Sequence, residues 1–377
     1  MKTIYLDHAA TTPVDPRVLK AMQPYFCAHY GNPSSMHHLG IHNKKAINTA
    51  RKTISTLLAC QPEEIIFTSG GTESINLALK GVAQANPLKK EIITTKVEHK
   101  ATLNACKFLE NNGYKVHYLA TDAMGLIDLT ELDSIINAHT LMISIIWGNN
   151  EIGTIQDIKK IIDICHKNDV LVHVDGVQII GQIPFDLKTY PVDLMTISAH
   201  KFYGPKGSGL LYVKKNTPIS AIIHGGDHEN GYRSGTENLM GIIGLVKAME
   251  LAYSDIKKQE NHKRELSTYF YKEIKEMHDV ILNGPMIGDQ RLPGHLSLSF
   301  KEIDGFQLSF ALDQRGVCVS TGSACSARII EPSHVLKAIK VDPDYIKGTL
   351  RITFGNHQNL SDVKAALKVF KDALACQ

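Results

Sequence analysis

The stretch Asp193-Leu-Met-Thr-Ile-Ser-Ala-His-Lys-Phe-Tyr-Gly-Pro-Lys-Gly207 joins a short apolar run to a lysine and a glycine-rich turn. The run Leu194 to Ile197 indicates a buried strand, and the glycines after Lys201 indicate a turn at its end. In an open α/β sheet, ligands bind outside the carboxyl ends of the strands, which places Lys201 where a ligand would lie. A partly desolvated lysine amine forms Schiff bases with carbonyl compounds, whereas most lysines are solvated surface groups. Lys201 is therefore a candidate catalytic residue.

Outward from this stretch, apolar runs alternate with helical patterns. The strands that we expect are 65–67, 91–95, 116–119, 141–146, 170–174, 193–198 and 210–213, and the helices between them are 73–84, 99–111, 128–137 and 155–167. Strands alternating with helices of this length are typical of an α/β fold, with a mostly parallel sheet and helices on both faces.

The pattern changes after about residue 245. A single long charged helix is expected near 246–277, then mixed elements, and a final amphipathic helix near 361–374. We therefore predict a large α/β domain over 16–245 and a smaller α+β domain formed by 1–15 and 246–377.

Composition excludes several classes of protein. The chain has 377 residues, 43% hydrophobic and 21% charged, with a net charge of +3, which gives no argument for nucleic acid or a membrane surface. We expect no signal peptide and no membrane span. Seven scattered cysteines without a Cys-x-x-Cys pair argue against disulfides and structural zinc, so we expect a cytoplasmic protein with free thiols.

Polar residues follow several of the expected strands. Asp175 could be a metal ligand, a ribose binder, a partner for a protonated ring nitrogen, or simply a helix cap. The turn 69–74, with Gly70 and Gly71, suits an anion at a helix N-terminus, although Thr72 could also be a plain cap. His99 opens the helix after strand 91–95, a position that favours a site role over ordinary packing.

Two further residues stand out. Arg351 lies inside the apolar run 350–354, where a guanidinium needs an anion, either a structural carboxylate or a substrate's. Cys325 lies among the small residues of 320–327, with little to pack against, which favours a nucleophile over an inert buried thiol.

Together these features resemble the class V aminotransferase group of pyridoxal-phosphate enzymes, and within it the NifS/IscS-like cysteine desulfurases. The motifs that carry the resemblance are TSGGTES from Thr68, EHKA from Glu98, NNEIG from Asn149, HVDGVQ from His173, SAHKFYGPKG from Ser198, RSGTEN from Arg233 and STGSACSA from Ser320. The resemblance implies fold type I of these enzymes, with a mostly parallel seven-stranded sheet and a smaller α+β domain.

The resemblance also implies roles for individual residues. Lys201 would bind pyridoxal phosphate and move the substrate's Cα proton, Asp175 would pair with the ring nitrogen, His99 would stack on the ring, and Gln178 would bind its phenolic oxygen. Gly71, Thr72, Ser198 and His200 would hold the phosphate, with Thr236 reaching it from the other subunit of a homodimer. Asn150 and Arg351 would position the substrate, and Cys325 would attack its sulfur. We expect His99, or another group near the cofactor, to take the thiol proton of Cys325.

The function implied is conversion of L-cysteine to L-alanine, with sulfur left as a persulfide on Cys325 for iron–sulfur cluster assembly or thiolation. A sulfur-acceptor protein is the expected partner, and no metal is expected in the resting enzyme beyond a transient iron–sulfur contact of the persulfide. A selenocysteine lyase, a class V aminotransferase and a catalytically silent scaffold are the alternatives. Cys325 weighs against the two enzymes, and the presence of Lys201 and Asp175 weighs against the scaffold.

Some features depart from the family pattern. Gly176 stands where alanine is usual, Trp147 where a smaller or imidazole side chain is common, and Asn356 where a basic residue is frequent. The chain stops at Gln377, without the longer tail by which housekeeping members dock an iron–sulfur scaffold, so the sulfur acceptor stays open.

Overall fold

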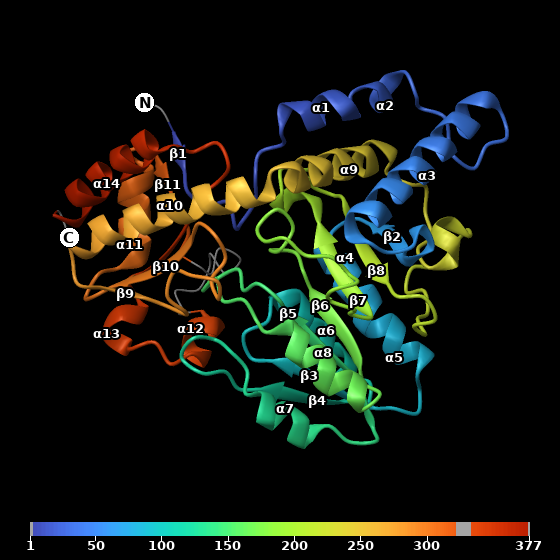
Figure 1. Ribbon diagram of the computed structural model, residues 1–377, viewed down its shortest axis with the longest axis horizontal. Coiled ribbons are helices and arrows are strands. Elements are labelled where there is room, and N and C mark those ends of the chain that lie inside the picture. Colours follow the sequence, from blue (N-terminus) through green and yellow to red (C-terminus); the bar gives the residue numbers. More distant parts are fainter. Residues whose placement is uncertain (1–2, 322–332, 376–377) are drawn as a thin grey trace.

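The structure is a computed structural model that describes residues 3–321 and 333–375 (Figure 1). Cys325 lies outside the described residues.

A seven-stranded sheet occupies the centre of the larger part of the molecule. Its strands are β2 (Ile65–Thr68), β3 (Glu91–Thr95), β4 (Lys115–Leu119), β5 (Thr140–Ile146), β6 (Leu171–Asp175), β7 (Leu194–Ser198) and β8 (Gly209–Val213). They lie in the order β2-β8-β7-β6-β5-β3-β4. The pairs from β7 to β4 are parallel, and β8 is antiparallel to both neighbours. The expected mostly parallel α/β sheet is confirmed.

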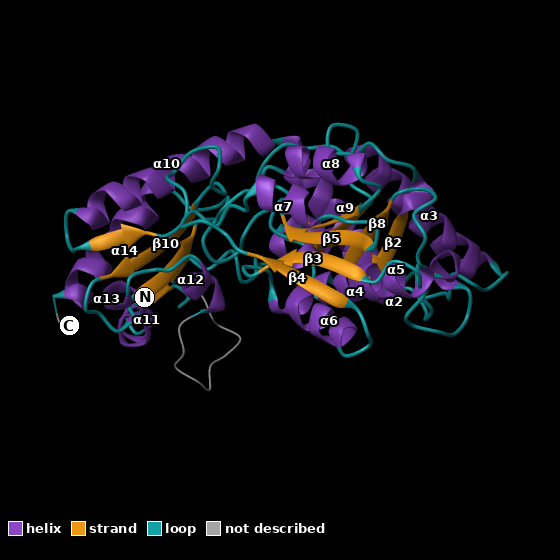
Figure 2. Cartoon of the chain, turned by 90° about the horizontal axis from the view of Figure 1, so that it is seen from below, coloured by secondary structure: helices purple, strands orange, loops and turns teal. Residues whose placement is uncertain are grey.

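Helices cover both faces of this sheet (Figure 2). One face packs against α3 (His38–Leu58), α8 (Ile158–Lys167) and α9 (Leu239–Ser254). The other packs against α4 (Gly71–Asn76), α5 (Val82–Ala85) and α6 (Lys100–Glu110). A π-helical turn, Leu77–Gly81, joins α4 to α5, and α7 (Leu129–Ile135) contacts α8. In α8 the side chains of Ile158, Ile161, Ile162 and Cys165 recur at helical spacing and are buried, because the face that they form lies against the sheet.

The remaining strands form two smaller sheets. β9 (Val280–Leu282), β10 (His295–Phe300) and β12 (Thr349–Thr353) are antiparallel, while β1 (Ile4–Tyr5) pairs in parallel with β11 (Val317–Cys318). They pack with α10 (Ile256–Lys275), α11 (Gly305–Asp313) and α14 (Leu360–Leu374) around Phe270, Phe300 and Phe370. The short helices α12 (His334–Ala338) and α13 (Pro343–Ile346) complete this part. The domain boundaries stay a prediction, although the cluster around the large sheet includes α9 up to Ala252.

The expected helix 246–277 is divided in the structure. Its residues belong to α9 and α10, separated at Asp255, whose φ of −133° and ψ of 27° are not helical. The break lets α9 pack in the core of the large sheet while α10 packs in the other core. Nearer the N-terminus, α1 (Pro16–Met22) and α2 (Pro24–Cys27) are separate helices, because Pro24 supplies no backbone N–H to continue the first one.

Candidate active site

The candidate site lies at the carboxyl-end edge of the seven-stranded sheet. Asp175 and Ser198 are the last residues of the neighbouring strands β6 and β7, and both are buried. The turn before α4 follows β2, and His99 follows β3. Because the carboxyl ends of parallel strands meet at one edge, residues far apart in the sequence gather there.

Lys201 closes a 3-10 turn, Ala199–Lys201, directly after β7. Its Nζ donates to the carbonyl oxygens of Ala9 at 2.7 Å and Ala10 at 2.9 Å. The side-chain amide of Gln178 donates to the same Ala9 carbonyl at 2.9 Å. The N-terminal segment therefore crosses the site and brings Lys201 and Gln178 to one point.

Asp175, His99 and Lys201 influence one another electrostatically. Burial raises the pKa of Asp175 above its ordinary value, and the neighbouring His99 and Lys201 act in the opposite direction. Surrounding atoms that desolvate His99 lower its pKa, as does Lys201, while Asp175 acts to raise it. A buried carboxyl group between two potential cations is suited to bind a protonated ring nitrogen.

The hydrogen bonding of His99 fixes which nitrogen carries its proton. His99 caps α6, where its Nδ1 accepts from the backbone N–H of Ala101 at 3.1 Å. The neutral ring therefore has its hydrogen on Nε2, since the other nitrogen uses its lone pair in the cap. This arrangement makes Nε2 a donor. It argues against our expectation that His99 takes the thiol proton of Cys325.

The turn between β2 and α4 has the geometry of an anion site. Gly70 has a φ of 147°, a conformation that side-chain-bearing residues rarely adopt. A Cβ on Gly71 would lie 3.1 Å from Val177 Cγ2 and 3.8 Å from Ser198 Cβ, so Ser198 lies beside the turn. The N-cap residue, Gly70, has no side chain to cap the helix, while the backbone N–H of Ser69, just before it, donates to Glu73 Oε2 at 2.8 Å. The turn predicted to hold phosphate, with Gly71 and Thr72, therefore presents backbone rather than side chains.

His200 and Thr236 occupy different surroundings. The Nδ1 of His200 lies 3.1 Å from Thr11 Oγ1, and burial lowers the pKa of His200 to about 4, which keeps the ring neutral at pH 7. Thr236 is exposed. Arg233, in the same RSGTEN motif, forms an ion pair at 2.8 Å with Glu73 of α4 in its own chain. The cross-subunit role of Thr236 stays a prediction.

Arg351 and Asn150 meet at the other side of the site. The side chain of Arg351 is buried; its Nη2 forms an ion pair with Asp7 at 2.8 Å and its Nη1 donates to the Asn150 carbonyl at 3.0 Å. Its Nε has no hydrogen-bond partner among the described residues. His295 Nε2 lies 3.1 Å from the same carbonyl oxygen. A guanidinium held in this way retains N–H donors for a second anion.

Several site neighbours were not singled out from the sequence. They are Asp7, Glu98, Glu151, His295, Ser333 and His334. Glu98 and Glu151 lie within the quoted motifs EHKA and NNEIG, so the only signal for them was proximity in sequence. His295 and His334 reach the site from strands and helices of the smaller sheets, and nothing in their local sequence indicates this.

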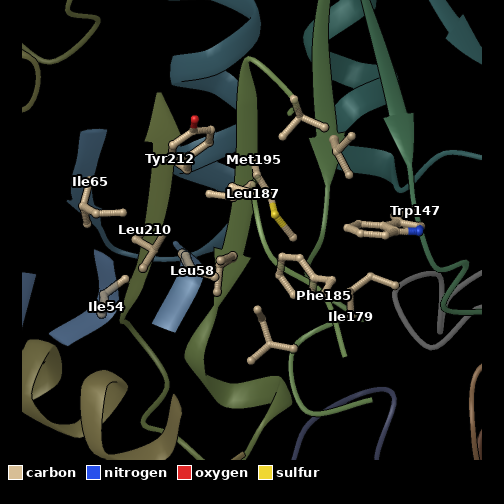
Figure 3. Packing of buried hydrophobic residues seen from close by; sticks show 14 of the residues in the cluster. Ile54, Leu58, Ile65, Trp147, Ile179, Phe185, Leu187, Met195, Leu210 and Tyr212 are labelled. Carbon is tan, nitrogen blue, oxygen red and sulfur yellow. The ribbon is translucent and has the colours of Figure 1, made fainter. Parts of the chain in front are cut away.

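Two of the three departures from the family pattern have a packing explanation. A Cβ on Gly176 would lie 2.1 Å from Met195 Cε, so the methionine occupies the space that an alanine would need. Trp147 is buried against Phe185, with ring centroids 5.2 Å apart (Figure 3). Its ring centroid also lies 4.8 Å from that of Tyr190. Both positions therefore belong to the core under the site. Asn356 donates its amide to Gln259 Oε1 at 2.9 Å, and nothing in the structure relates it to the substrate.

The site residues fit pyridoxal phosphate. A lysine, a buried carboxyl group and a glycine turn at a helix N-terminus gather at one sheet edge. They match the carbonyl carbon, the ring nitrogen and the phosphate of this cofactor.

The profile of the aminotransferase class-V family matches residues 4–366, and the chain belongs to this family. The cofactor of the chain is pyridoxal phosphate, in line with its family.

Individual relatives narrow the class. A protein named cysteine desulfurase IscS from Dictyoglomus turgidum is 46% identical over 372 residues, covering 98% of this chain and 94% of the relative. A solved structure titled NifS-like protein is 39% identical with a TM-score of 0.94, covering 100% of both chains. Another, titled SspA in complex with cysteine, is 35% identical with a TM-score of 0.83, covering 95% of this chain and 100% of that one.

In the part of the chain that the structure describes, no helix is long and apolar enough to cross a membrane. Within residues 3–321 and 333–375, no group of three or more histidine, cysteine, aspartate or glutamate side chains is placed to hold a metal ion.

Proposed function

We propose that this protein is a cysteine desulfurase that converts L-cysteine to L-alanine and leaves the sulfur as a persulfide on Cys325. The observation that carries the proposal is the gathering of Lys201 and Asp175 at one sheet edge of a class V aminotransferase fold, with the buried Arg351 bound to Asp7 and the Asn150 loop. The names of the relatives support the choice of reaction within the family.

We assign the chain's residues as follows. Lys201 binds the cofactor and carries the Cα proton, Asp175 holds the ring nitrogen protonated, and Gln178 donates to the phenolic oxygen. Gly71, Thr72, Ser198 and His200 bind the phosphate, with Thr236 added from the second subunit of a homodimer. Bound pyridoxal phosphate supplies an electron sink for the bonds broken at Cα and Cβ.

Arg351 and the Asn150 loop orient the substrate carboxylate. In the structure the guanidinium is already fixed by Asp7 and by the Asn150 carbonyl. The substrate therefore meets a preorganised donor, which reduces the entropy lost on binding. His99 offers a proton or a hydrogen bond through Nε2, because its Nδ1 is engaged in the helix cap.

In the sulfur-transfer step, the thiol of Cys325 accepts the sulfur atom of the substrate. The Cβ–S bond of the substrate breaks and an S–S bond forms to the Cys325 sulfur. The electron pair of the broken bond stays on carbon, which takes up protons to become the methyl group of alanine. The enzyme thiol is thereby oxidised to a persulfide, so no external oxidant or reductant is needed.

A thiol of a sulfur-acceptor protein then bonds to the outer sulfur as the S–S bond to Cys325 breaks, so the acceptor carries the persulfide and the Cys325 thiol is restored. We propose iron–sulfur cluster assembly or thiolation in the cytoplasm as the destination of this sulfur. The protein carries no resident metal in this scheme, although the Cys325 persulfide could contact an iron–sulfur cluster transiently. Selenocysteine lyase and aminotransferase activities are not favoured by the relatives' names.

Two measurements test the assignment. Borohydride reduction of the yellow holoenzyme followed by peptide mass spectrometry should place the fixed cofactor on Lys201, and Lys201→Ala should be inactive. With L-cysteine and a thiol reductant, the wild type should release alanine and sulfide in equal amounts. Fixation on another lysine, or ammonia and pyruvate as the main products, would contradict the proposal.

A further inference from the structure

The short helix α12 lies against both loops that carry proposed site residues of the large sheet. Val335, Leu336 and Ile339 of α12 are buried in a small apolar cluster with Val97 and Ile152. Val97 stands two residues before His99, and Ile152 two residues after Asn150. A helix from the part of the chain around the smaller sheets therefore packs on the two loops at once.

Two polar contacts give this packing a definite register. Ser333 caps α12, with its Oγ accepting from Val335 N at 3.0 Å, and the same hydroxyl donates to Glu151 Oε2. His334 Nε2 donates to the carbonyl oxygen of Glu98 at 2.9 Å. That carbonyl belongs to the peptide group whose nitrogen is the backbone nitrogen of His99. The hydrogen bond therefore fixes the peptide plane from which His99 begins.

The position of His99 depends on that peptide. Its φ of −62° and ψ of 147° set the direction in which the side chain leaves the helix N-terminus. The cap to Ala101 holds the ring from one side, and His334 holds the preceding peptide from the other. His334 is also close enough to act electrostatically on both His99 and Glu151.

We propose that His334 is a positioning residue for the reaction, acting through its hydrogen bond to the Glu98 carbonyl to orient His99. The inference rests on the role assigned to His99 under the proposed function. His334 itself touches neither substrate nor cofactor.

Four variants of the holoenzyme test this inference. His334→Gln keeps an amide N–H donor at a similar reach, whereas His334→Asn is polar but too short for the Glu98 carbonyl. His99→Ala is the benchmark for a lost imidazole. His139→Leu, at an exposed histidine away from the site, is the control. The measurements are kcat and KM for cysteine, the visible circular dichroism of the bound cofactor, cofactor content and Tm.

We expect His334→Asn to lower kcat about fivefold, the value of one lost hydrogen bond. KM and cofactor content should stay unchanged, and the dichroism band should shift in the direction seen with His99→Ala. His334→Gln should restore kcat to within about twofold of the wild type, as a kept hydrogen bond predicts. Activity that is kept in His334→Gln but lost in His334→Asn would show that His334 acts by orienting His99 through its hydrogen bond and not only by packing.

Three results would overturn the inference. In the first, His334→Asn has the same kcat and dichroism as the control His139→Leu, although His99→Ala is impaired. This result would contradict the role of His334 but not the proposed function. Another is equal damage by Gln and Asn, which would make His334 structural. In the third, His99→Ala has the same kcat and dichroism as the wild type. This result would contradict both the role assigned to His99 and the inference about His334.

Discussion

Arg351 is a cation with only 3% of its surface exposed, and such a charge persists only where anions and carbonyls compensate it. Asp7 supplies the negative charge at 2.8 Å, and the Asn150 carbonyl supplies an acceptor. Because the guanidinium is oriented before the substrate arrives, its remaining donors are available for a carboxylate.

Arg351→Ala should therefore weaken cysteine binding by about ten- to a hundredfold, since a charge-assisted pair contributes roughly 1.5–3 kcal/mol. The affinity of Arg351→Lys for cysteine should fall between those of the wild type and Arg351→Ala, because lysine keeps the charge without the bidentate geometry. Titration of the holoenzyme with cysteine, followed by absorbance, measures the affinity. Loss of cofactor from Arg351→Ala would show instead that the arginine is structural.

Glu98 predicts a pH dependence of stability. Its side chain is fully buried, where Oε1 accepts from Thr95 Oγ1 at 2.7 Å and from Ile146 N at 3.0 Å. Burial raises the pKa of Glu98 from 4.5 to about 8. The folded state thus holds a proton that the unfolded state releases above pH 4.5. The stability that this group contributes is full below pH 4.5 and is lost as pH rises towards 8.

Glu98→Gln keeps the shape and the acceptor oxygen without the ionisation. Its Tm should match the wild type near pH 5 and exceed it by a growing margin up to pH 8. Thermal unfolding of both proteins across this range, monitored by circular dichroism, measures the difference. A constant difference at all pH values would mean that Glu98 does not titrate in this window.

Several of the residues that sequence reasoning identified lie at strand ends. Asp175, Ser198 and Lys201 follow apolar runs, and the topology of parallel strands brings such ends together. Asp7, His295 and His334 were missed because their partners lie 344, 145 and 236 residues away in the sequence. No local pattern encodes contacts of that separation.

At the scale of elements, the turn between β2 and α4 depends on one glycine. Gly70 combines φ of 147° with ψ of −174°, a region that is almost exclusive to glycine. The turn presents the first N–H groups of α4 only while this conformation is kept.

Gly70→Ala should weaken pyridoxal-phosphate binding by about five- to 150-fold, because backbone strain of about 1–3 kcal/mol falls on the phosphate turn. Gly113→Ala is the matched control: its φ of 84° is also left-handed, and a Cβ there meets nothing within 4 Å. Fluorescence titration of the apoproteins with the cofactor measures both affinities. Equal affinities would show that the turn does not hold the phosphate.

The division of the expected helix 246–277 shows that hydrophobic periodicity does not predict where tertiary packing breaks a helix. The helices α9 and α10 pack in two different cores, and this tertiary packing requires a break between them. Asp255 is the N-cap residue of α10, and aspartate is a preferred residue at that position. Its side chain makes no capping hydrogen bond there, so the local sequence signal for the break is weak.

At the scale of the whole molecule, the proposal requires two chains, because Thr236 is assigned to the partner's phosphate. Subunits carrying Thr236→Ala and subunits carrying Lys201→Ala should each be impaired as homodimers. A mixed dimer then has one site with both lesions and one intact site, so the mixed dimer should have about half of the wild-type activity. Because random exchange of equal amounts makes about half of the dimers mixed, the exchanged sample as a whole should recover about a quarter. No recovery would place Thr236 in its own subunit's site.

The central claim is that the sulfur of cysteine passes to Cys325. The direct measurement is peptide mass spectrometry after incubation with L-cysteine without reductant, combined with quantification of alanine. We expect one additional sulfur atom on the peptide that contains Cys325, in step with alanine formed in the first turnover. Cys27→Ser, at an exposed free cysteine, should behave as the wild type. Cys325→Ser should keep its cofactor and form neither persulfide nor alanine; alanine at the wild-type rate from this variant would contradict the account.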